Sequence, residues 1–490
     1  MYNFSYYSDK YQYMQAKSLF DRGMKDEIAI FNLYFRSAPE NNNWALVSGV
    51  EEVLNAVNHL GDTPEGFFEK ILPGDDYKNF REYLKNIKFT GNVYAMKEGE
   101  IAFANQPIIT IEAPIIQAQL LETPLLNIMN HQMRVATKTS RITRASSKIV
   151  YEFGSRQSNG PLASTFGSKA TYIGGCKYIS NVVIAAKYGI ESRGSMAHSY
   201  INAFGFGINN EYEAFDNYIK SHKGEDILLL IDTYDTLKCG VKNAIKAFKN
   251  NGIDDSYSNI YGVRLDSGDL SYLSNKCRQE LDMAELWKCK IAVTNSLDEN
   301  LISDLERQNA IIDIYGVGDS VMAMKGTLPF GNIYKLVQFD GKPVMKISDN
   351  KEKLTNPGFQ ITYRIIKHRF FQGDVTCLKG DHMSQDIKSS KKIILRQESD
   401  RTRRTTFEAG SYTYRQLQKQ MIKDGEIIWN IPNIKDRRDY YFSNLKCLNK
   451  TQTRLLNPHY YKVNISDSLY NQKIQMVELL YSEIANYESK

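Results

Sequence analysis

Four short apolar runs lie in the middle of the chain, and each ends in polar residues with catalytic potential. The runs span 227–231, 260–263, 291–293 and 311–314, and the residues that follow them include Asp232, Arg264, Asp266, Thr294 and Gly318. Between the runs, apolar residues recur at helical intervals, as at Leu237, Val241 and Phe248. Strand and helix therefore alternate with a unit of roughly 20 to 35 residues, which predicts βα repeats on a parallel sheet.

The polar residues at the ends of these runs predict one shared site. Parallel strands present their carboxyl ends at the same edge of a sheet or barrel, where folds of this kind bind ligands. The alternative is that each polar cluster only caps the following helix, as Asp and Ser often do. Four such clusters in succession favour the shared site.

The second of these strand ends suits a substrate that carries both phosphate and sugar hydroxyls. Arg264 can pair with anionic oxygen, while Asp266 or Asp269 can accept hydroxyls or hold a magnesium ion. After the last run, Gly316 and Gly318 would let backbone amides come close to a phosphate. These residues predict an enzyme that handles phosphate groups.

His198 stands among small residues, in the segment Gly194-Ser195-Met196-Ala197-His198-Ser199. A lone histidine is often a hydrogen-bonded structural residue, and that alternative stays open here. A neutral imidazole can also act as a nucleophile toward phosphorus. A carboxylate on its other nitrogen would then orient the ring and stabilise the charged product.

Composition excludes several other classes of protein. A chain of 490 residues predicts two or three domains, and a net charge of +6 is small for a protein that coats nucleic acid. The six cysteines form no Cys-x-x-Cys pair, which favours reduced thiols over a zinc site or disulfides. Without a visible signal peptide or an apolar stretch of about 18 residues, we expect a cytoplasmic protein with no membrane partner. Basic clusters near Lys391, Arg403 and Arg437 are expected to be solvated surface.

Several further motifs occur in a fixed order, and together they resemble the nicotinate phosphoribosyltransferase family. They fade after about Pro357, and they include Asp9-Lys10-Tyr11-Gln12, Leu121-Glu122-Thr123-Pro124, Phe153-Gly154-Ser155-Arg156, Tyr172-Ile173-Gly174-Gly175, Ser180-Asn181-Val182, the His198 segment, Asp232-Thr233-Tyr234-Asp235, Val263-Arg264-Leu265-Asp266-Ser267-Gly268-Asp269, Tyr334-Lys335-Leu336-Val337 and Met345-Lys346-Ile347-Ser348. The resemblance implies an α/β fold, with an irregular α/β barrel between an α/β amino-terminal domain and a carboxyl-terminal domain. We place these domains at 1–110, 111–337 for the barrel, and 338–490, the last packing partly with the first.

The resemblance also implies an activity and assigns site residues. The family joins nicotinate to phosphoribosyl pyrophosphate, giving nicotinate mononucleotide and pyrophosphate, in NAD salvage by the Preiss-Handler pathway. ATP hydrolysis is coupled through a phosphorylated histidine, and Mg²⁺ is expected on the pyrophosphate without a dedicated metal site. The implied catalytic residues are His198, supported by Asp232, and Arg264 and Asp266. Those implied for nicotinate are Phe153, Arg156, Ser180 and Tyr11. Those implied for the phosphoribosyl group are Arg264, Asp266, Gly268, Gly316, Gly318 and Arg141. Because the Tyr11 motif reaches a neighbouring subunit in this family, a homodimer with sites at the subunit interface is also implied.

This sequence departs from the family pattern at three positions. Ser195 replaces a threonine and keeps the hydroxyl, Gln157 replaces a common second arginine, and Asp319 places an acid beside the phosphate loop. Two alternatives follow, a nicotinamide phosphoribosyltransferase and a non-catalytic nucleotide-binding regulator. The nicotinamide enzymes carry an aspartate where Ser180 stands here, and a hydroxyl can donate to a carboxylate, so nicotinate is favoured.

Overall fold

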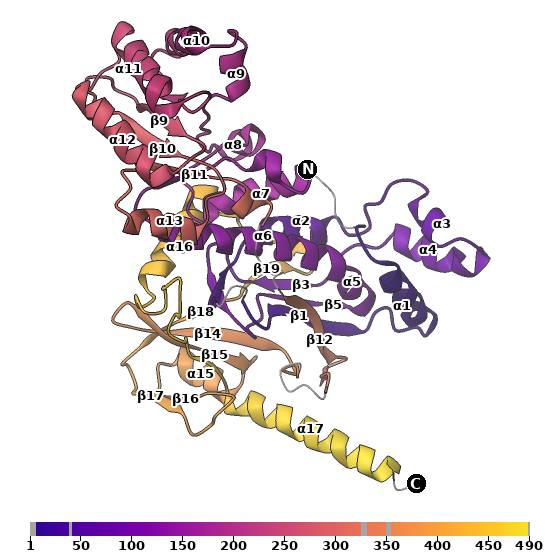
Figure 1. The fold of residues 1–490 in the computed structure, drawn as a ribbon. Helices are drawn as coiled ribbons and strands as arrows, with labels where there is room; N and C mark the ends of the chain where they lie inside the picture. Colours follow the sequence, from indigo (N-terminus) through magenta and orange to yellow (C-terminus); the bar gives the residue numbers. More distant parts are fainter. Residues whose placement is uncertain (1–5, 39–41, 325–330, 349–353, 489–490) are drawn as a thin grey trace. The chain divides into compact units, whose positions relative to one another are not determined.

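The computed structural model describes residues 6–38, 42–324, 331–348 and 354–488 (Figure 1). The chain divides into two compact units. Unit 1 combines Met1–Arg134 with Leu328–Lys490, and unit 2 is Val135–Thr327. The predicted boundaries at 110 and 337 stay a prediction.

Unit 2 is built on a parallel sheet of six strands, in the order β7-β6-β11-β10-β9-β8. The strands are β6 (Ile149–Glu152), β7 (Tyr178–Ile179), β8 (Ile227–Leu230), β9 (Tyr261–Leu265), β10 (Lys290–Val293) and β11 (Ile314–Val317). The helices of this unit include α7 (Pro161–Ile173), α8 (Val182–Tyr188), α9 (His198–Asn202), α10 (Ile208–Ser221), α11 (Val241–Asn250), α12 (Leu270–Met283), α13 (Glu299–Arg307) and α14 (Asp319–Met322). The predicted α/β fold with alternating strands and helices is therefore confirmed.

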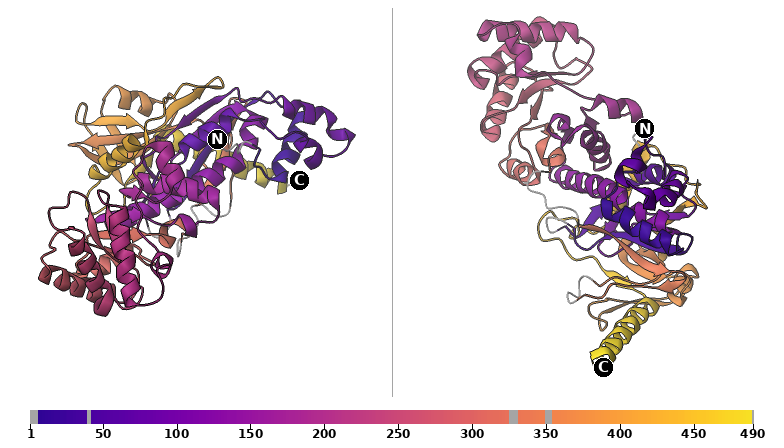
Figure 2. Two further views of the ribbon diagram at one scale, coloured as in Figure 1. Left: turned by 90° about the horizontal axis from the view of Figure 1, so that it is seen from above. Right: turned by 90° about the vertical axis from the view of Figure 1, so that its right-hand side faces the viewer.

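Apolar side chains on both faces of this sheet explain why it forms. Leu229, Val263 and Ile291 are paired in register and fully buried on one face. Leu228, Ala292 and Ile314 belong to a second buried cluster, on the other face, as expected for parallel strands that carry helices. Helix α12 packs on β9 and β10, and α11 packs against α10 and α12. Figure 2 shows these elements of unit 2 from two further sides.

The last strand of the series lies three residues later than we expected. The apolar run 311–314 was predicted to be the strand and Gly316 to follow it, but β11 starts at Ile314 and includes Gly316. A glycine usually weakens a strand, which is why the sequence pattern misled us. Here a Cβ on Gly316 would come within 2.8 Å of the Phe153 ring and 2.5 Å of the Thr294 methyl group. Close packing between neighbouring strands therefore requires the glycine.

Unit 1 contains an antiparallel sheet of seven strands, in the order β13-β12-β1-β5-β3-β19-β20. The strands are β1 (Ile28–Phe35), β3 (Asn92–Ala95), β5 (Ile109–Pro114), β12 (Asn332–Phe339), β13 (Lys342–Pro343), β19 (Lys419–Lys423) and β20 (Glu426–Ile427). A four-stranded sheet joins β14 (Gln360–Lys367), β15 (Phe370–Leu378), β18 (Thr413–Gln416) and β21 (Val463–Ile465). Two short pairs join β2 (Trp44–Leu46) with β4 (Ile101–Phe103), and β16 (Ile393–Arg396) with β17 (Arg404–Phe407).

The α-helices of unit 1 have 5 to 13 residues, with two exceptions. They include α1 (Lys10–Asp21), α2 (Val50–Asn58), α3 (Phe67–Ile71), α4 (Lys78–Lys85), α5 (Ile115–Leu120), α15 (His382–Lys388) and α16 (Ile434–Lys446). The long helices are α6 (Glu122–Arg144), which ends beyond the unit boundary, and α17 (Asp467–Glu488). Helix α5 ends at Leu120, and α6 begins two residues later at Glu122.

A buried ion network holds the sheets of unit 1. The Arg364 guanidinium is fully buried and donates to both carboxylate oxygens of Asp374, to Glu100 and to the Ile101 carbonyl, at 2.6 to 2.8 Å. Because these carboxylates lie beside it, the pKa of Arg364 is raised well above its usual value although burial opposes this.

The carboxyl-terminal basic residues are not all on the surface. Arg437 is buried and pairs with Glu51 and Glu98 at 2.6 and 2.5 Å, so our expectation of solvated surface is wrong for this residue. The reason is that two acids far away in the sequence compensate its charge. Arg403, by contrast, is exposed as expected.

The described ranges contain neither a membrane-spanning helix nor a disulfide. No helix there is long and apolar enough to cross a membrane. No disulfide joins the cysteines of these ranges, and five of the six thiols are buried.

Candidate active site

The structure brings the predicted residues of unit 2 to one edge of its parallel sheet. Phe153 and Arg156 follow β6, Ser180 follows β7, and Asp232 lies just beyond β8. Arg264 lies within β9, and residues 266–268 follow that strand, while Gly318 follows β11. Because all six strands are parallel, these positions share the carboxyl edge. Arg141 and Gly316 lie elsewhere in unit 2, in α6 and inside β11.

His198 is the first residue of α9, and its side chain is 42% exposed. Its Nδ1 lies 3.1 Å from the Thr233 hydroxyl, and its Nε2 lies 3.9 Å from Asp232 Oδ1. The Asp232 carboxyl is 2% exposed, and within the described part of the chain its Oδ1 has no hydrogen-bond partner. A buried carboxylate oxygen without a donor is costly, so this atom is suited to receive a proton-bearing ring nitrogen.

The other oxygen of Asp232 organises the turn after β9. Asp232 Oδ2 accepts from the Ser267 hydroxyl at 2.5 Å and from the Asp266 backbone amide at 3.2 Å. The Thr294 hydroxyl donates to Asp266 Oδ1. Ser267 and Thr294 were not among our predicted site residues, although both occur in the polar strand ends that signalled the site.

Arg264 is the cation at the centre of this edge. Burial lowers the pKa of its guanidinium, and the nearby carboxylates of Asp266 and Asp232 oppose that shift while Arg156 adds to it. Among the described residues, nothing accepts a hydrogen bond from its buried Nε. Two arginines thus lie close together beside two acids, which suits an anionic ligand that also carries hydroxyl groups.

Phe153 packs over the backbone of β11. The close approach of its ring to Gly316 leaves no space there for a side chain, so the structure explains Gly316 by packing. Just after β11, the Gln157 side-chain oxygen lies so close to Gly318 that it would clash with a Cβ there. The departure at Gln157 therefore places an uncharged amide directly against the predicted phosphate loop.

Asp319 begins α14, next to Gly318. Its Oδ1 accepts from the Ser320 backbone amide at 2.9 Å, and its Oδ2 accepts from the Ser296 hydroxyl at 3.4 Å. A phosphate that approached this amide would meet a carboxylate already bound there. The acid is therefore in a position to weaken phosphate binding.

Glu152 is a site-edge residue that our sequence reading missed. Its side chain is fully buried at the end of β6, where it accepts from the Gly154 backbone amide and, at 3.2 Å, from the Ser168 hydroxyl. Burial raises its pKa to about 7, although these hydrogen bonds oppose the shift. The carboxyl group braces the turn that carries Phe153 and Arg156. An acid within an apolar strand, Ile149-Val150-Tyr151-Glu152, was the available signal.

Arg141 lies in a buried ion cluster. Its Nε donates to Glu299 at 2.7 Å, and Lys138 lies 3.0 Å from the same carboxyl. Burial alone would raise the pKa of Glu299. The two cations lower it by more, so its pKa lies below the usual value. Glu299 opens α13, so this cluster fixes the start of that helix to α6.

Tyr11 lies in unit 1 and is 47% exposed in α1. Asp9, from the same motif, accepts from the Thr123 hydroxyl at 2.7 Å. The described residues contain no cluster of three or more His, Cys, Asp or Glu side chains that could hold a metal ion.

Comparison with known proteins gives this arrangement a family. Models of the amino-terminal and carboxyl-terminal domains of nicotinate phosphoribosyltransferase match residues 7–130 and 360–473. A nicotinate phosphoribosyltransferase from Bacillus subtilis (strain 168) is 35% identical over 489 residues, covering 98% of this chain and 96% of the relative. The chain belongs to the nicotinate phosphoribosyltransferase family.

Other members and solved structures agree with this assignment. The nicotinate phosphoribosyltransferase of Dictyostelium discoideum is 29% identical, with 95% of this chain and 86% of that one covered. The crystal structure of human nicotinic acid phosphoribosyltransferase superposes with a TM-score of 0.82 at 24% identity, covering 96% and 99% of the two chains. At that identity the superposition shows the shared fold, which is the family fold predicted from the motifs.

Proposed function

We propose that this protein is a nicotinate phosphoribosyltransferase that forms nicotinate mononucleotide and pyrophosphate from nicotinate and phosphoribosyl pyrophosphate in NAD salvage. The observation that carries the proposal is the partly buried Arg264, whose buried Nε has no acceptor among the described residues, beside Asp266 and Asp232 at the carboxyl edge of the parallel sheet. The names of the relatives support the choice of substrates.

The residues of this edge suit the charge changes of such a transfer. The ribosyl C1 becomes electron-poor as pyrophosphate leaves, so the site must hold a dense negative charge with groups already in place. Arg264 and Arg156 would supply positive charge, and Asp266 would accept the ribose hydroxyls. Phe153 would stack on the pyridine ring and hold its nitrogen behind C1. Mg²⁺ bound to the pyrophosphate would neutralise part of the leaving group's charge, and the Asp266 carboxylate, held by Thr294, would be a candidate ligand for it.

His198 would couple ATP hydrolysis to the transfer. One ring nitrogen would attack the γ-phosphorus of ATP, forming an N–P bond as the bond to the ADP oxygen breaks. Asp232 Oδ1, 3.9 Å from Nε2, would then approach and stabilise the charged ring through its N–H. Thr233, at Nδ1, would hold the ring in this orientation before the reaction.

Ser180 would select nicotinate over nicotinamide. It follows β7 and is partly buried, and its backbone amide donates to the Glu152 carbonyl at 3.0 Å. Its hydroxyl can donate to a carboxylate, whereas an aspartate at this position would repel one.

We further propose a homodimer in which Tyr11 of one subunit contributes to the nicotinate site of the other. The exposure of Tyr11 and the fixed position of Asp9 beside Thr123 are consistent with this role.

The decisive experiment compares turnover of nicotinate and nicotinamide with phosphoribosyl pyrophosphate, with and without ATP. We expect nicotinate to be used faster and ATP to increase the rate. Faster use of nicotinamide would contradict the role of Ser180, and no turnover of either would favour a nucleotide-binding regulator.

A second experiment tests His198 directly. Incubation with γ-labelled ATP should give a base-stable, acid-labile phosphate on the wild-type protein and none on His198→Ala. His222→Ala is the matched control, since His222 stacks on Tyr218 at the end of α10 and should leave the labelling unchanged. Label that persists in His198→Ala would place the phosphate elsewhere.

A further inference from the structure

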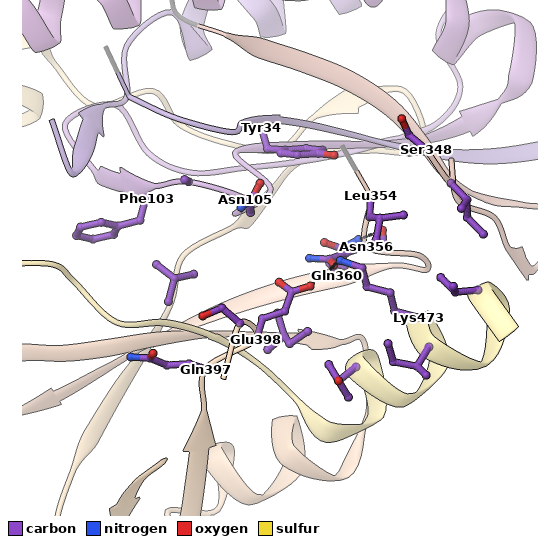
Figure 3. A pocket seen from close by; sticks show the side chains of 18 of the residues that line it. Tyr34, Phe103, Asn105, Ser348, Leu354, Asn356, Gln360, Gln397, Glu398 and Lys473 are labelled. Atoms are coloured by element: carbon purple, nitrogen blue, oxygen red, sulfur yellow. Dashed lines mark hydrogen bonds and ion pairs between the residues drawn. The ribbon is translucent and has the colours of Figure 1, made fainter. Parts of the chain in front are cut away.

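Unit 1 contains a cavity of about 820 Å³ that none of the site residues of unit 2 lines (Figure 3). Its walls come from β1, β4, β14, the segment after β16, and α17. The lining residues include Tyr34, Asn105, Gln360, Glu398, Tyr460 and Lys473. The volume lies within the range of about 300 to 1,000 Å³ that is typical of small-molecule sites. Mixed aromatic and amide walls, rather than a purely apolar surface, favour a specific ligand.

Tyr34 is the first observation that points to a ligand. The residue is 8% exposed, and among the described residues its buried hydroxyl has no hydrogen-bond partner. Burial raises its pKa to about 12, so the hydroxyl keeps its proton at neutral pH. A buried donor without an acceptor destabilises the fold, and such groups in native proteins are rare and often functional.

The opposite wall carries a compensated pair of charges. Lys473 Nζ lies 2.5 Å from Glu398 Oε1 and donates to Asn356 Oδ1 at 3.0 Å. Figure 3 shows Glu398 and Lys473 across the cavity from Tyr34. Since the two charges already neutralise each other, a phosphate group here would bring an uncompensated negative charge next to Glu398. The cavity therefore favours an uncharged ligand.

The polar groups of the cavity define which hydrogen-bond donors and acceptors that ligand needs. Tyr34 offers a donor, Glu398 offers carboxylate acceptors, and the amides of Asn105 and Gln360 line the same cavity. A ligand edge with an acceptor next to an N–H donor, as in a nucleobase, would match this pair. Tyr460 lines the same cavity and is 60% exposed, so its ring offers an aromatic surface that suits a planar base.

We propose that this cavity of unit 1 binds an uncharged nucleoside, with the edge of its base between Tyr34 and Glu398. The site is separate from the proposed catalytic edge and does not rest on the proposed function. Because α17 supplies Lys473, a bound nucleoside would connect the first turns of this helix to β1. Binding would thus slow hydrogen exchange in the first turns of α17.

The test measures binding of adenosine, guanosine and uridine to the full-length protein by calorimetry, with AMP as the charged counterpart. We expect at least one nucleoside to bind, and its affinity to fall at least tenfold in Tyr34→Phe and in Glu398→Gln. The matched nucleoside monophosphate should bind no more tightly to this site. Tyr412→Phe is the control, because Tyr412 lies outside the cavity and its hydroxyl already donates to the Lys391 carbonyl.

Two readouts separate a real site from a folding defect or from binding at the catalytic edge. Tyr34→Phe should melt no lower than the wild type, because it removes a hydroxyl that has no partner. Hydrogen exchange should slow in 28–35 and 467–477 when the nucleoside is added. Failure of all three nucleosides to bind, unchanged affinity in Tyr34→Phe, or protection confined to 230–236 and 264–270 would each overturn the proposal.

Discussion

Arg264 in unit 2 and Arg364 in unit 1 show how the same side chain serves two purposes. Arg364 is fully buried with acceptors around its whole guanidinium, and its pKa is raised by Asp374 and Glu100. Arg264 is partly buried, its Nε has no acceptor among the described residues, and its pKa is lowered. An arginine whose guanidinium has all its hydrogen-bond acceptors within the protein stabilises the fold. An arginine that lacks an acceptor is what we expect at a ligand-binding site.

The largest effect on stability is expected from removing the fully paired arginine, Arg364. Arg364→Met would leave the carboxylates of Asp374 and Glu100 buried without compensation, and should lower the free energy of unfolding by about 3–5 kcal/mol. Urea denaturation measures this. Arg403→Met, which affects only an exposed pair with Asp400, should change it by less than about 0.5 kcal/mol. Near-equal losses in the two variants would remove the distinction drawn between buried and surface arginines.

At the carboxyl edge of the unit 2 sheet we expect the opposite result, a large loss of activity with little loss of stability. Arg264→Met should lower kcat/KM for phosphoribosyl pyrophosphate by about 10²- to 10³-fold, because a positioned cation at the developing charge is lost. Its urea midpoint should stay close to that of the wild type. Arg307→Met, at an exposed position of α13, should leave both quantities unchanged. A large stability loss with normal kcat/KM would make Arg264 structural, like Arg364.

The buried acid Glu152 should make the free energy of unfolding depend on pH. The folded chain holds this proton more tightly than the unfolded chain, since the pKa rises from 4.5 to about 7. The free energy of unfolding should therefore fall by about 3 kcal/mol as the pH rises from 4.5 to above 7. Glu152→Gln should remove this slope while keeping an acceptor for the Gly154 amide. Glu69→Gln, at an exposed acid whose pKa is lowered, should keep the wild-type slope above pH 5. Identical slopes in wild type and Glu152→Gln would show that Glu152 is not the titrating group.

The smallest effect is expected at Asp319. Asp319→Asn would remove a negative charge beside Gly318, and should lower KM for phosphoribosyl pyrophosphate by about two- to fivefold, corresponding to about 0.4–1 kcal/mol. Steady-state kinetics with Asp304→Asn as the control would measure it. An increase in KM would mean that the carboxylate helps the substrate, for example through the Ser320 amide.

The sequence predicted unit 2 much better than unit 1. Apolar runs alternating with helical patterns located β8, β9 and β10 within a residue or two, because each strand and its helix are local in the chain. The sheet of unit 1 pairs β1 with β12 and β3 with β19, and no local pattern reveals partners so far apart. Burial of Arg437 escaped us for the same reason, since Glu51 and Glu98 come from the other end of the chain.

The site shows a similar division. The polar strand ends identified Asp232, Arg264 and Asp266, which the structure brings to one edge. The hydrogen bonds that hold them in place were not predicted, because Thr294, Ser267 and Glu152 are common residue types whose partners only the folded chain defines. The family motifs assign roles to residues, and the hydrogen bonds explain how those residues are oriented.

The antiparallel pairing of β1 with β12 also has a consequence for synthesis on the ribosome. Residues 28–35 are made early, but their partner strand, 332–339, is made only after the whole of unit 2. Until then, β1 presents an open edge of apolar residues such as Ile30, Phe31 and Leu33. Unit 2 can complete its own sheet from consecutive residues during that interval. A slow or halted translation between 135 and 327 would therefore prolong the stage at which the nascent chain is most prone to aggregate.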